Sequence, residues 1–216
     1  MHRTTLRRLA SATGAITLAL GLAACGDDGG DSRPAAVETA RNGDVFNRAD
    51  VDFATAMIPH HAQALRMALL AQDRPLPDEV RALVDQVQAA QTPEVETMTT
   101  WLTDWGKDIP ATSMDHANAG HDMEDMDDMD DMDGMGGSAM PGMMSGEQME
   151  ELEGSSDADF PRLWMTMMIE HHEGAITMAK AEQADGRFPD AIALAESIAE
   201  SQAAEIATME DLLGNG

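Results

Sequence analysis

A segment of this chain recurs without a gap at an offset of 111 residues, and this duplication limits the fold more than any other feature. The two copies are centred on Met57–His61 (MIPHH) and Met168–His172 (MIEHH). Outside these motifs the same offset pairs Ala64 with Ala175, Met67 with Met178, Ala68 with Ala179, Leu83 with Leu194, Gln91 with Gln202, Glu94 with Glu205, Met98 with Met209 and Leu102 with Leu213. The chain is therefore a duplicated structural unit.

Apolar residues in each copy recur with a helical period. In the first copy one apolar stripe passes beside the paired histidines, a turn follows, and a second stripe ends at Gly106. The second copy repeats the pattern after Asp159. We expect one helical hairpin over residues 46–106 and another over 160–214. Neither hairpin can bury its apolar stripe alone, so the two are expected to pack together as an all-α four-helix bundle.

Between the hairpins, residues 107–159 form an acidic, methionine-rich segment with few branched apolar side chains. Such a composition cannot bury enough apolar surface to order itself, and we expect a long disordered loop here. Residues 25–45 are rich in Gly, Asp, Ser and Pro near their start and predict a flexible tether.

Residues 1–24 combine three arginines with an apolar run that contains no acidic residue, as in a secretory signal peptide. The run ends at Leu-Ala-Ala before Cys25, which resembles a bacterial lipobox. We therefore expect cleavage before Cys25, acylation of that cysteine, and an extracytoplasmic protein anchored to a bacterial membrane.

Cys25 is the single cysteine in the chain. If it is acylated, no thiol remains for a blue-copper site, a catalytic nucleophile or a disulfide. The net charge of −27 at pH 7 makes nucleic acid an unsuitable partner.

Soft and borderline metal donors are retained in both copies. Met57 lies four residues before His61, and Met168 lies four before His172, so each pair shares one helix face. The metal candidates are Met57, His60, His61, Met67, Met168, His171, His172 and Met178, with Met98 and Met209 as secondary candidates. Thioether and imidazole donors favour copper, Cu(I) in particular. Two sites per repeat, or one site and one structural histidine, both remain open.

A structural explanation of the same residues is that the methionines fill core gaps and each histidine bonds a backbone carbonyl, Gln91 or Gln202. For one methionine or histidine this would be the better explanation, but the retention of both kinds in two diverged copies favours a metal. Neither copy contains the Glu-x-x-His pair of di-iron bundles or the His-Glu-x-x-His motif of zinc proteases. No catalytic constellation is found, and we do not expect an enzyme.

The acidic segment holds a second group of possible donors: His116, His121, Met123, Met126, Met129, Met132 and Met135. Its methionines recur at every third position. Core packing does not explain them, because a disordered segment has no core to fill. They predict a weaker site for copper, and the alternative is low-complexity drift.

The sequences Met57–Ala64 and Met168–Ala175 resemble the family called domain of unknown function 305, including its CopM-like copper-binding proteins. The resemblance implies a ferritin-like helical bundle, export, and copper binding through Met and His. Ala62 and Gln63 depart from the acidic residue and glycine that usually follow the paired histidines in this family. The two copies are therefore not expected to bind equally.

The leading hypothesis is a lipid-anchored copper-binding protein for capture, delivery or tolerance, with a copper donor or acceptor protein as partner. One alternative is a membrane-tethered interaction protein whose acidic loop binds a basic partner. A weaker alternative is a metal-dependent oxidoreductase.

Overall fold

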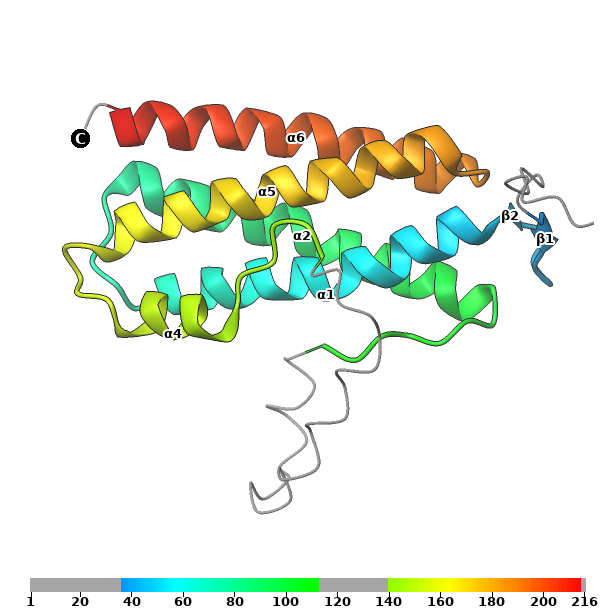
Figure 1. The fold of residues 1–216 in the computed structure, drawn as a ribbon, viewed down its shortest axis with the longest axis horizontal. Helices are drawn as coiled ribbons and strands as arrows, with labels where there is room; N and C mark the ends of the chain where they lie inside the picture. The colour runs from blue at the N-terminus through cyan, green and yellow to red at the C-terminus, as the bar shows by residue number, and fades with distance from the viewer. Residues whose placement is uncertain (1–35, 113–139, 215–216) are drawn as a thin grey trace, which may run out of the picture. The chain divides into compact units, whose positions relative to one another are not determined.

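The structure, a computed structural model, describes residues 36–112 and 140–214. The long helices are α1 (Arg48–Ala71), α2 (Asp78–Asp104), α5 (Phe160–Asp185) and α6 (Pro189–Gly214), shown in Figure 1. A short helix, α4 (Gly146–Gly154), precedes α5, and a two-stranded antiparallel sheet of β1 (Glu38–Thr39) and β2 (Val45–Phe46) precedes α1. Cys25 lies outside the described residues.

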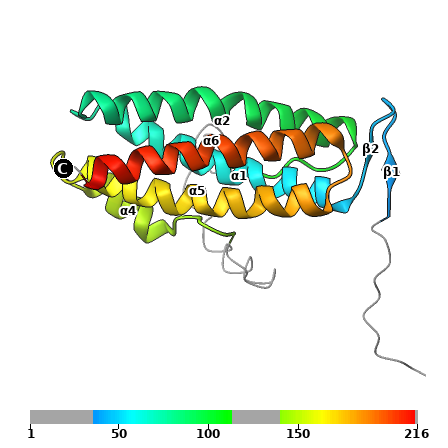
Figure 2. The ribbon, with the colours of Figure 1, turned by 90° about the horizontal axis from the view of Figure 1, so that it is seen from above.

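The helices run in the order up, down, down, up. α1 and α2 form one antiparallel hairpin, α5 and α6 form the other, and α5 runs opposite to α1 (Figures 1 and 2). α2 and α5 therefore run in the same direction, which is the helix order of ferritin-like folds. The predicted four-helix bundle of two hairpins is confirmed.

Two core clusters fill the bundle, one toward each end. The first joins the second half of α1 and the first half of α2 to the start of α5, with Met67, Met168 and Met209 among its members. The second joins the first half of α1 and the end of α2 to the start of α6, with Met57 and Met98 among its members. His60 and His171, at the middle of α1 and α5, fall between the two clusters in the helix sequences.

The start of α1 is fastened to the turn between α5 and α6. Asn47 and Asp50 form a capping box, in which each side chain accepts a hydrogen bond from the other residue's backbone N–H. The buried Asp50 carboxylate also accepts hydrogen bonds from the backbone N–H groups of Arg187 and Phe188, at 2.9 and 2.8 Å. One carboxylate therefore ties together the two hairpins at this end.

The disorder predicted for all of residues 107–159 is wrong for part of that segment. Residues 146–154 form α4, which starts with a capping box between Ser145 and Gln148 and buries Met149 and Leu152. Those two apolar residues, three apart on one helix face, supply the packing that the overall acidic composition obscured. Residues 113–139, with the predicted donors from His116 to Met135, lie outside the described residues.

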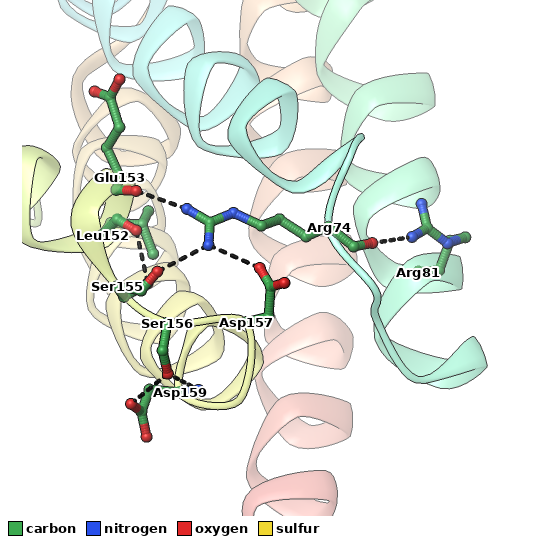
Figure 3. A network of polar contacts seen from close by, with 8 residues as sticks. All are labelled: Arg74, Arg81, Leu152, Glu153, Ser155, Ser156, Asp157 and Asp159. Atoms are coloured by element: carbon green, nitrogen blue, oxygen red, sulfur yellow. Dashed lines mark hydrogen bonds and ion pairs between the residues drawn. The ribbon is translucent and has the colours of Figure 1, made fainter.

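Arg74, just after α1, holds the connection between α4 and α5 in place (Figure 3). Its guanidinium donates hydrogen bonds to the carbonyl oxygens of Glu153 and Ser155 and forms an ion pair with Asp157. The guanidinium of Arg81 donates in turn to the carbonyl of Arg74, at 2.6 Å. The short helix α4 is therefore fixed to the first hairpin at its C-terminal end.

The tether predicted over residues 25–45 differs from the structure at its end, because β1 and the first residue of β2 lie within it. None of the helices in the part of the chain that the structure describes is long and apolar enough to cross a lipid bilayer.

Candidate metal centre

Four histidine side chains are fully buried in the middle of the bundle. His60 and His61 come from α1, and His171 and His172 come from α5; each is 0% exposed. Two neighbouring residues on a helix point about 100° apart. In each copy, the first histidine of the pair consequently faces the opposite hairpin while the second faces the other helix of its own hairpin, as their contacts demonstrate.

The second histidine of each pair bonds a glutamate of its own hairpin. His61 Nε2 lies 2.8 Å from Glu94 Oε2 on α2, and His172 Nε2 lies 2.7 Å from Glu205 Oε2 on α6. Since a carboxylate can only accept, Nε2 carries the proton and Nδ1 keeps a lone pair in the neutral ring. Both Nδ1 atoms are buried without a hydrogen-bond partner. A histidine oriented by a carboxylate, with its other nitrogen available, is the arrangement found around protein-bound metals.

Buried methionines lie on the same helix faces as these pairs. Met57 precedes His61 by one turn on α1, and Met98 follows Glu94 by one turn on α2. The second hairpin repeats the arrangement with Met168 and Met209. All four methionines are at most 1% exposed, and the two of each hairpin share one core cluster. Each hairpin thus holds an imidazole nitrogen and two thioethers in the same part of its core.

The first histidines of the two copies meet each other. The ring centroids of His60 and His171 are 3.8 Å apart, with 36° between the ring planes. His60 Nε2 donates to the carbonyl oxygen of Pro141 at 3.0 Å, while its Nδ1 has no partner. The His171 ring makes no hydrogen bond of good geometry, although the backbone of His60 lies close to it.

These two rings are neutral imidazoles. Burial, and next the charge that neighbouring His61 would carry, lowers the pKa of His60 from 6.5 to about 3. Burial also lowers the pKa of His171 well below its ordinary value, with the other three histidines adding to the effect. A neutral ring retains a nitrogen lone pair, so both side chains can act as metal ligands at neutral pH.

Gln91 and Gln202 do not satisfy the histidines, contrary to the structural explanation considered above. Both amides are buried, and none of their oxygen and nitrogen atoms has a hydrogen-bond partner within the described residues. That explanation also gave each histidine a backbone carbonyl as a possible partner, and His60 has such a partner in Pro141. Each unsatisfied buried polar group costs about 1–3 kcal/mol. A ligand that bonded these atoms would offset that cost.

A backbone segment, Pro141–Met144, contacts α1 at His60 and Gln63 and α5 at Gly174. The Gln63 amide donates to the Met144 carbonyl and accepts from the Met144 N–H, at 2.8 and 2.7 Å. On α5, Gly174 leaves room for Pro141 and Gly142, because any Cβ there would collide with the Pro141 carbonyl. The departure of Gln63 from the glycine of the other copy is thereby explained: one position anchors this strap and its counterpart makes space for it.

Met67 and Met178, predicted as equivalent donors, lie in different surroundings. Met67 is fully buried, and its carbonyl accepts a hydrogen bond from the indole of Trp164. Met178 is half-buried and lines a surface groove with Phe53 and Glu182. These two positions match in the sequence repeat, but their surroundings differ.

The carboxylates and histidines of the described residues do not form a metal site by themselves. Within residues 36–112 and 140–214, no group of three or more His, Cys, Asp and Glu side chains is arranged to hold a metal ion. A metal in this core must include other donors, and the buried thioethers fit that requirement. A soft ion is accordingly the better match for the residues present.

The fold and this centre define a class: a four-helix bundle with a buried histidine–methionine core. The chain belongs to the family described as "Domain of unknown function (DUF305)", whose model matches residues 50–213, and the predicted membership is confirmed. No curated protein matches the chain.

Solved structures of two DUF305 proteins and of CopM have the same fold. A DUF305 fragment from Deinococcus radiodurans is 28% identical, covers 83% of this chain and all of its own, and has a TM-score of 0.63. A DUF305 protein from Streptomyces coelicolor, inferred to be secreted, is 28% identical over 77% of this chain and 93% of its own, with a TM-score of 0.62. CopM in its Cu(II)-bound form is 26% identical over 77% and 96%, with a TM-score of 0.59.

Proposed function

We propose that this protein binds copper through the histidines and methionines of its bundle core and works outside the cytoplasm in copper capture, delivery or tolerance. The observation that carries the proposal is the repeated His–Glu pair, whose Nδ1 is unpartnered, in a hairpin whose core also holds two buried methionines. It is a binding function, because no catalytic arrangement was recognised among the sequence motifs.

Copper suits these donors better than the other common metals. Imidazole nitrogen is acceptable to Cu(I) and Cu(II), and thioether sulfur selects Cu(I). Zinc sites normally use three or four donors drawn from Cys, His and carboxylates, a set that the described residues do not assemble. The solved structure of CopM in its Cu(II)-bound form, 26% identical to this chain, supports the proposal.

We assign the principal ligands to Met57, His61, Met168 and His172, in agreement with the sequence-based hypothesis. Met98 and Met209 move from secondary to principal candidates, because each lies in the same core cluster as the methionine of its own hairpin. Glu94 and Glu205 are positioning residues that hold the imidazole rings. His60 and His171 are candidates for a shared central site.

The location and partners follow from the N-terminal sequence. A signal peptide over residues 1–24 and acylation of Cys25 would tether the bundle to the outer side of a bacterial membrane. The related Streptomyces coelicolor protein, inferred to be secreted, supports an extracytoplasmic place. A copper donor or acceptor protein at that surface is the expected partner.

Elemental analysis of the purified full chain after loading with Cu(I) tests the proposal. Three proteins are compared: the parent, a variant with His60, His61, His171 and His172 changed to Asn, and a control with His116 and His121 changed to Asn. The parent and the control should retain copper through desalting, whereas the core variant should lose the tightly held fraction. Full retention by the folded core variant would contradict the assignment.

A further inference from the structure

A groove between α1 and α4 adjoins the buried centre. Its walls are formed by Pro59, Gln63 and Arg66 of α1 and by Met143, Met144 and Met149 around the start of α4. Three of the eight lining residues carry thioethers. Met143 is half-buried, and Met144 and Met149 are buried. The groove therefore leads from solvent to sulfur atoms that are covered by the protein.

The groove is continuous with the core on two sides. Met144 and Met149 belong to the same core cluster as Met67 and Met168, and Met168 lies one turn before His172. On the other side, the strap that carries Met143 and Met144 bonds to His60 through the carbonyl of Pro141. Two of the three methionines of the groove thus pack in the same core cluster as the proposed ligand Met168.

The chemistry of the groove selects a soft, weakly charged ion. Thioethers are neutral and have little affinity for hard cations such as Mg²⁺ and Ca²⁺, whose preferred ligands are oxygens. Arg66 and Glu150, both exposed at the groove, carry opposite charges, so neither sign dominates. A monovalent Cu(I) ion meets less repulsion from Arg66 than a divalent ion would.

A metal also needs a route, because all four core histidines are 0% exposed. The Pro141–Met144 strap contacts His60 on α1 and Gly174 on α5, and it is fastened by two hydrogen bonds between its Met144 backbone and the Gln63 side chain. These bonds are short-range and local, and their opening would leave the four long helices in place. Access through the strap therefore requires less rearrangement than separation of the hairpins.

We propose that the groove lined by Met143, Met144 and Met149 is a second Cu(I) site, at which the ion is held before it passes under the strap to the buried histidines. This proposal rests on copper binding by the core, and it assigns an entry function to three methionines. No electron transfer is involved, since the ion keeps its oxidation state and exchanges one set of neutral ligands for another.

The test compares loading rates and copper content in the full chain. The entry variant changes Met143, Met144 and Met149 to Leu, which preserves apolar volume and costs little stability. The control changes Met165 to Leu, because Met165 is buried, is not among the candidate ligands and does not line the groove. Cu(I) is supplied anaerobically from a coloured chelator, and its release is followed by stopped-flow absorbance. Tightly bound copper is then measured after desalting.

We expect the entry variant to load about tenfold more slowly, which corresponds to about 1.4 kcal/mol of lost encounter affinity. Its tightly held copper should remain at the parental level, and the control should match the parent in both measurements. An unchanged loading rate in the entry variant overturns the proposal while leaving core binding intact. If the parent itself retains no copper, the proposed function fails, and the entry site fails with it.

A single Met143→Leu variant guards against misfolding, because Met143 is only half-buried and its loss should not disturb the core. Far-UV circular dichroism and a thermal melt establish whether each variant is folded. If the triple variant is unfolded, slower loading by Met143→Leu supports the proposal, and parental loading by that variant overturns it.

Discussion

His61 of α1 and Glu94 of α2 are joined by a hydrogen bond of 2.8 Å, and the same bond recurs at 2.7 Å between His172 and Glu205. In both copies the glutamate lies 33 residues after the histidine, across the hairpin turn. Each hairpin therefore contains one imidazole whose Nε2 is fixed by a carboxylate and whose Nδ1 is turned away from that partner. The duplication has preserved a geometry as well as a set of residues.

Removal of the carboxylates should weaken copper binding without abolishing it. In a Glu94→Gln and Glu205→Gln double variant, an amide replaces each carboxylate, so the imidazole is less well oriented and less basic. We expect the affinity for copper to fall about 10–100-fold. Chelator competition measures the affinity, and Glu96→Gln, an exposed change on α2, serves as the control. An affinity equal to that of the parent would remove the positioning role.

The duplicated bundle and the buried histidine–methionine pattern were accessible from the sequence, because helical periodicity and a gapless offset are local properties. Glu94 and Glu205 were visible as repeated positions, but their partners were not identified. A contact across a hairpin depends on the rotation of one helix against the other, which helical periodicity does not give. The fixed spacing of 33 residues in both copies was the signal that could have found the pairs.

The strap and α4 were missed for a different reason. Composition averaged over residues 107–159 is acidic and poor in branched apolar residues, which hides the few positions that pack, such as Met149 and Leu152. The different surroundings of Met67 and Met178 were likewise unpredictable from the repeat: Met67 shares a core cluster with Met149 and Leu152 of α4, whereas Met178 lines a surface groove with Phe53. The repeat predicts the structure that the two copies share, but it does not predict the strap and α4, which pack on the bundle without a counterpart in the repeat.

Gly174→Ala should loosen the strap. A Cβ at this position collides with the carbonyl of Pro141, which has to move and take the hydrogen bond to His60 with it. We expect a loss of about 1–3 kcal/mol in the free energy of unfolding, as for other overpacking changes. Denaturant unfolding gives the value. Gly154→Ala is the matched control, because an added Cβ there meets open space. Equal stability of the two variants would show that the strap is not held by close packing on α5.

Glu182 should make the apo protein less stable as the pH rises. Burial, and next the nearby Asp50 carboxyl, raises the pKa of Glu182 from 4.5 to about 8. Between these values the folded protein holds a proton that the unfolded chain has released, so the free energy of unfolding falls with increasing pH. Below pH 4.5 this group contributes no such slope.

In Glu182→Gln the slope from Glu182 should disappear, and the variant should gain on the order of a few kcal/mol relative to the parent by pH 8. Urea unfolding at a series of pH values between 4.5 and 8 measures the difference. Glu200→Gln, an exposed change on α6, is the control and should follow the parent. A parallel pH dependence in Glu182→Gln and the parent would contradict the raised pKa.

His171 and His61 should respond in opposite ways to replacement by leucine in the metal-free protein. The His171 ring makes no hydrogen bond of good geometry, so His171→Leu removes two unsatisfied polar atoms from the core. Its free energy of unfolding should stay within about 1 kcal/mol of the parent or increase. His61→Leu instead leaves the Glu94 carboxylate, only 13% exposed, without its partner, and should cost about 1–3 kcal/mol. Chemical denaturation after treatment with a chelator gives both values. A structural role for His171 predicts a loss at least as large as that of His61→Leu, whereas a ligand role predicts little change in stability together with reduced copper retention.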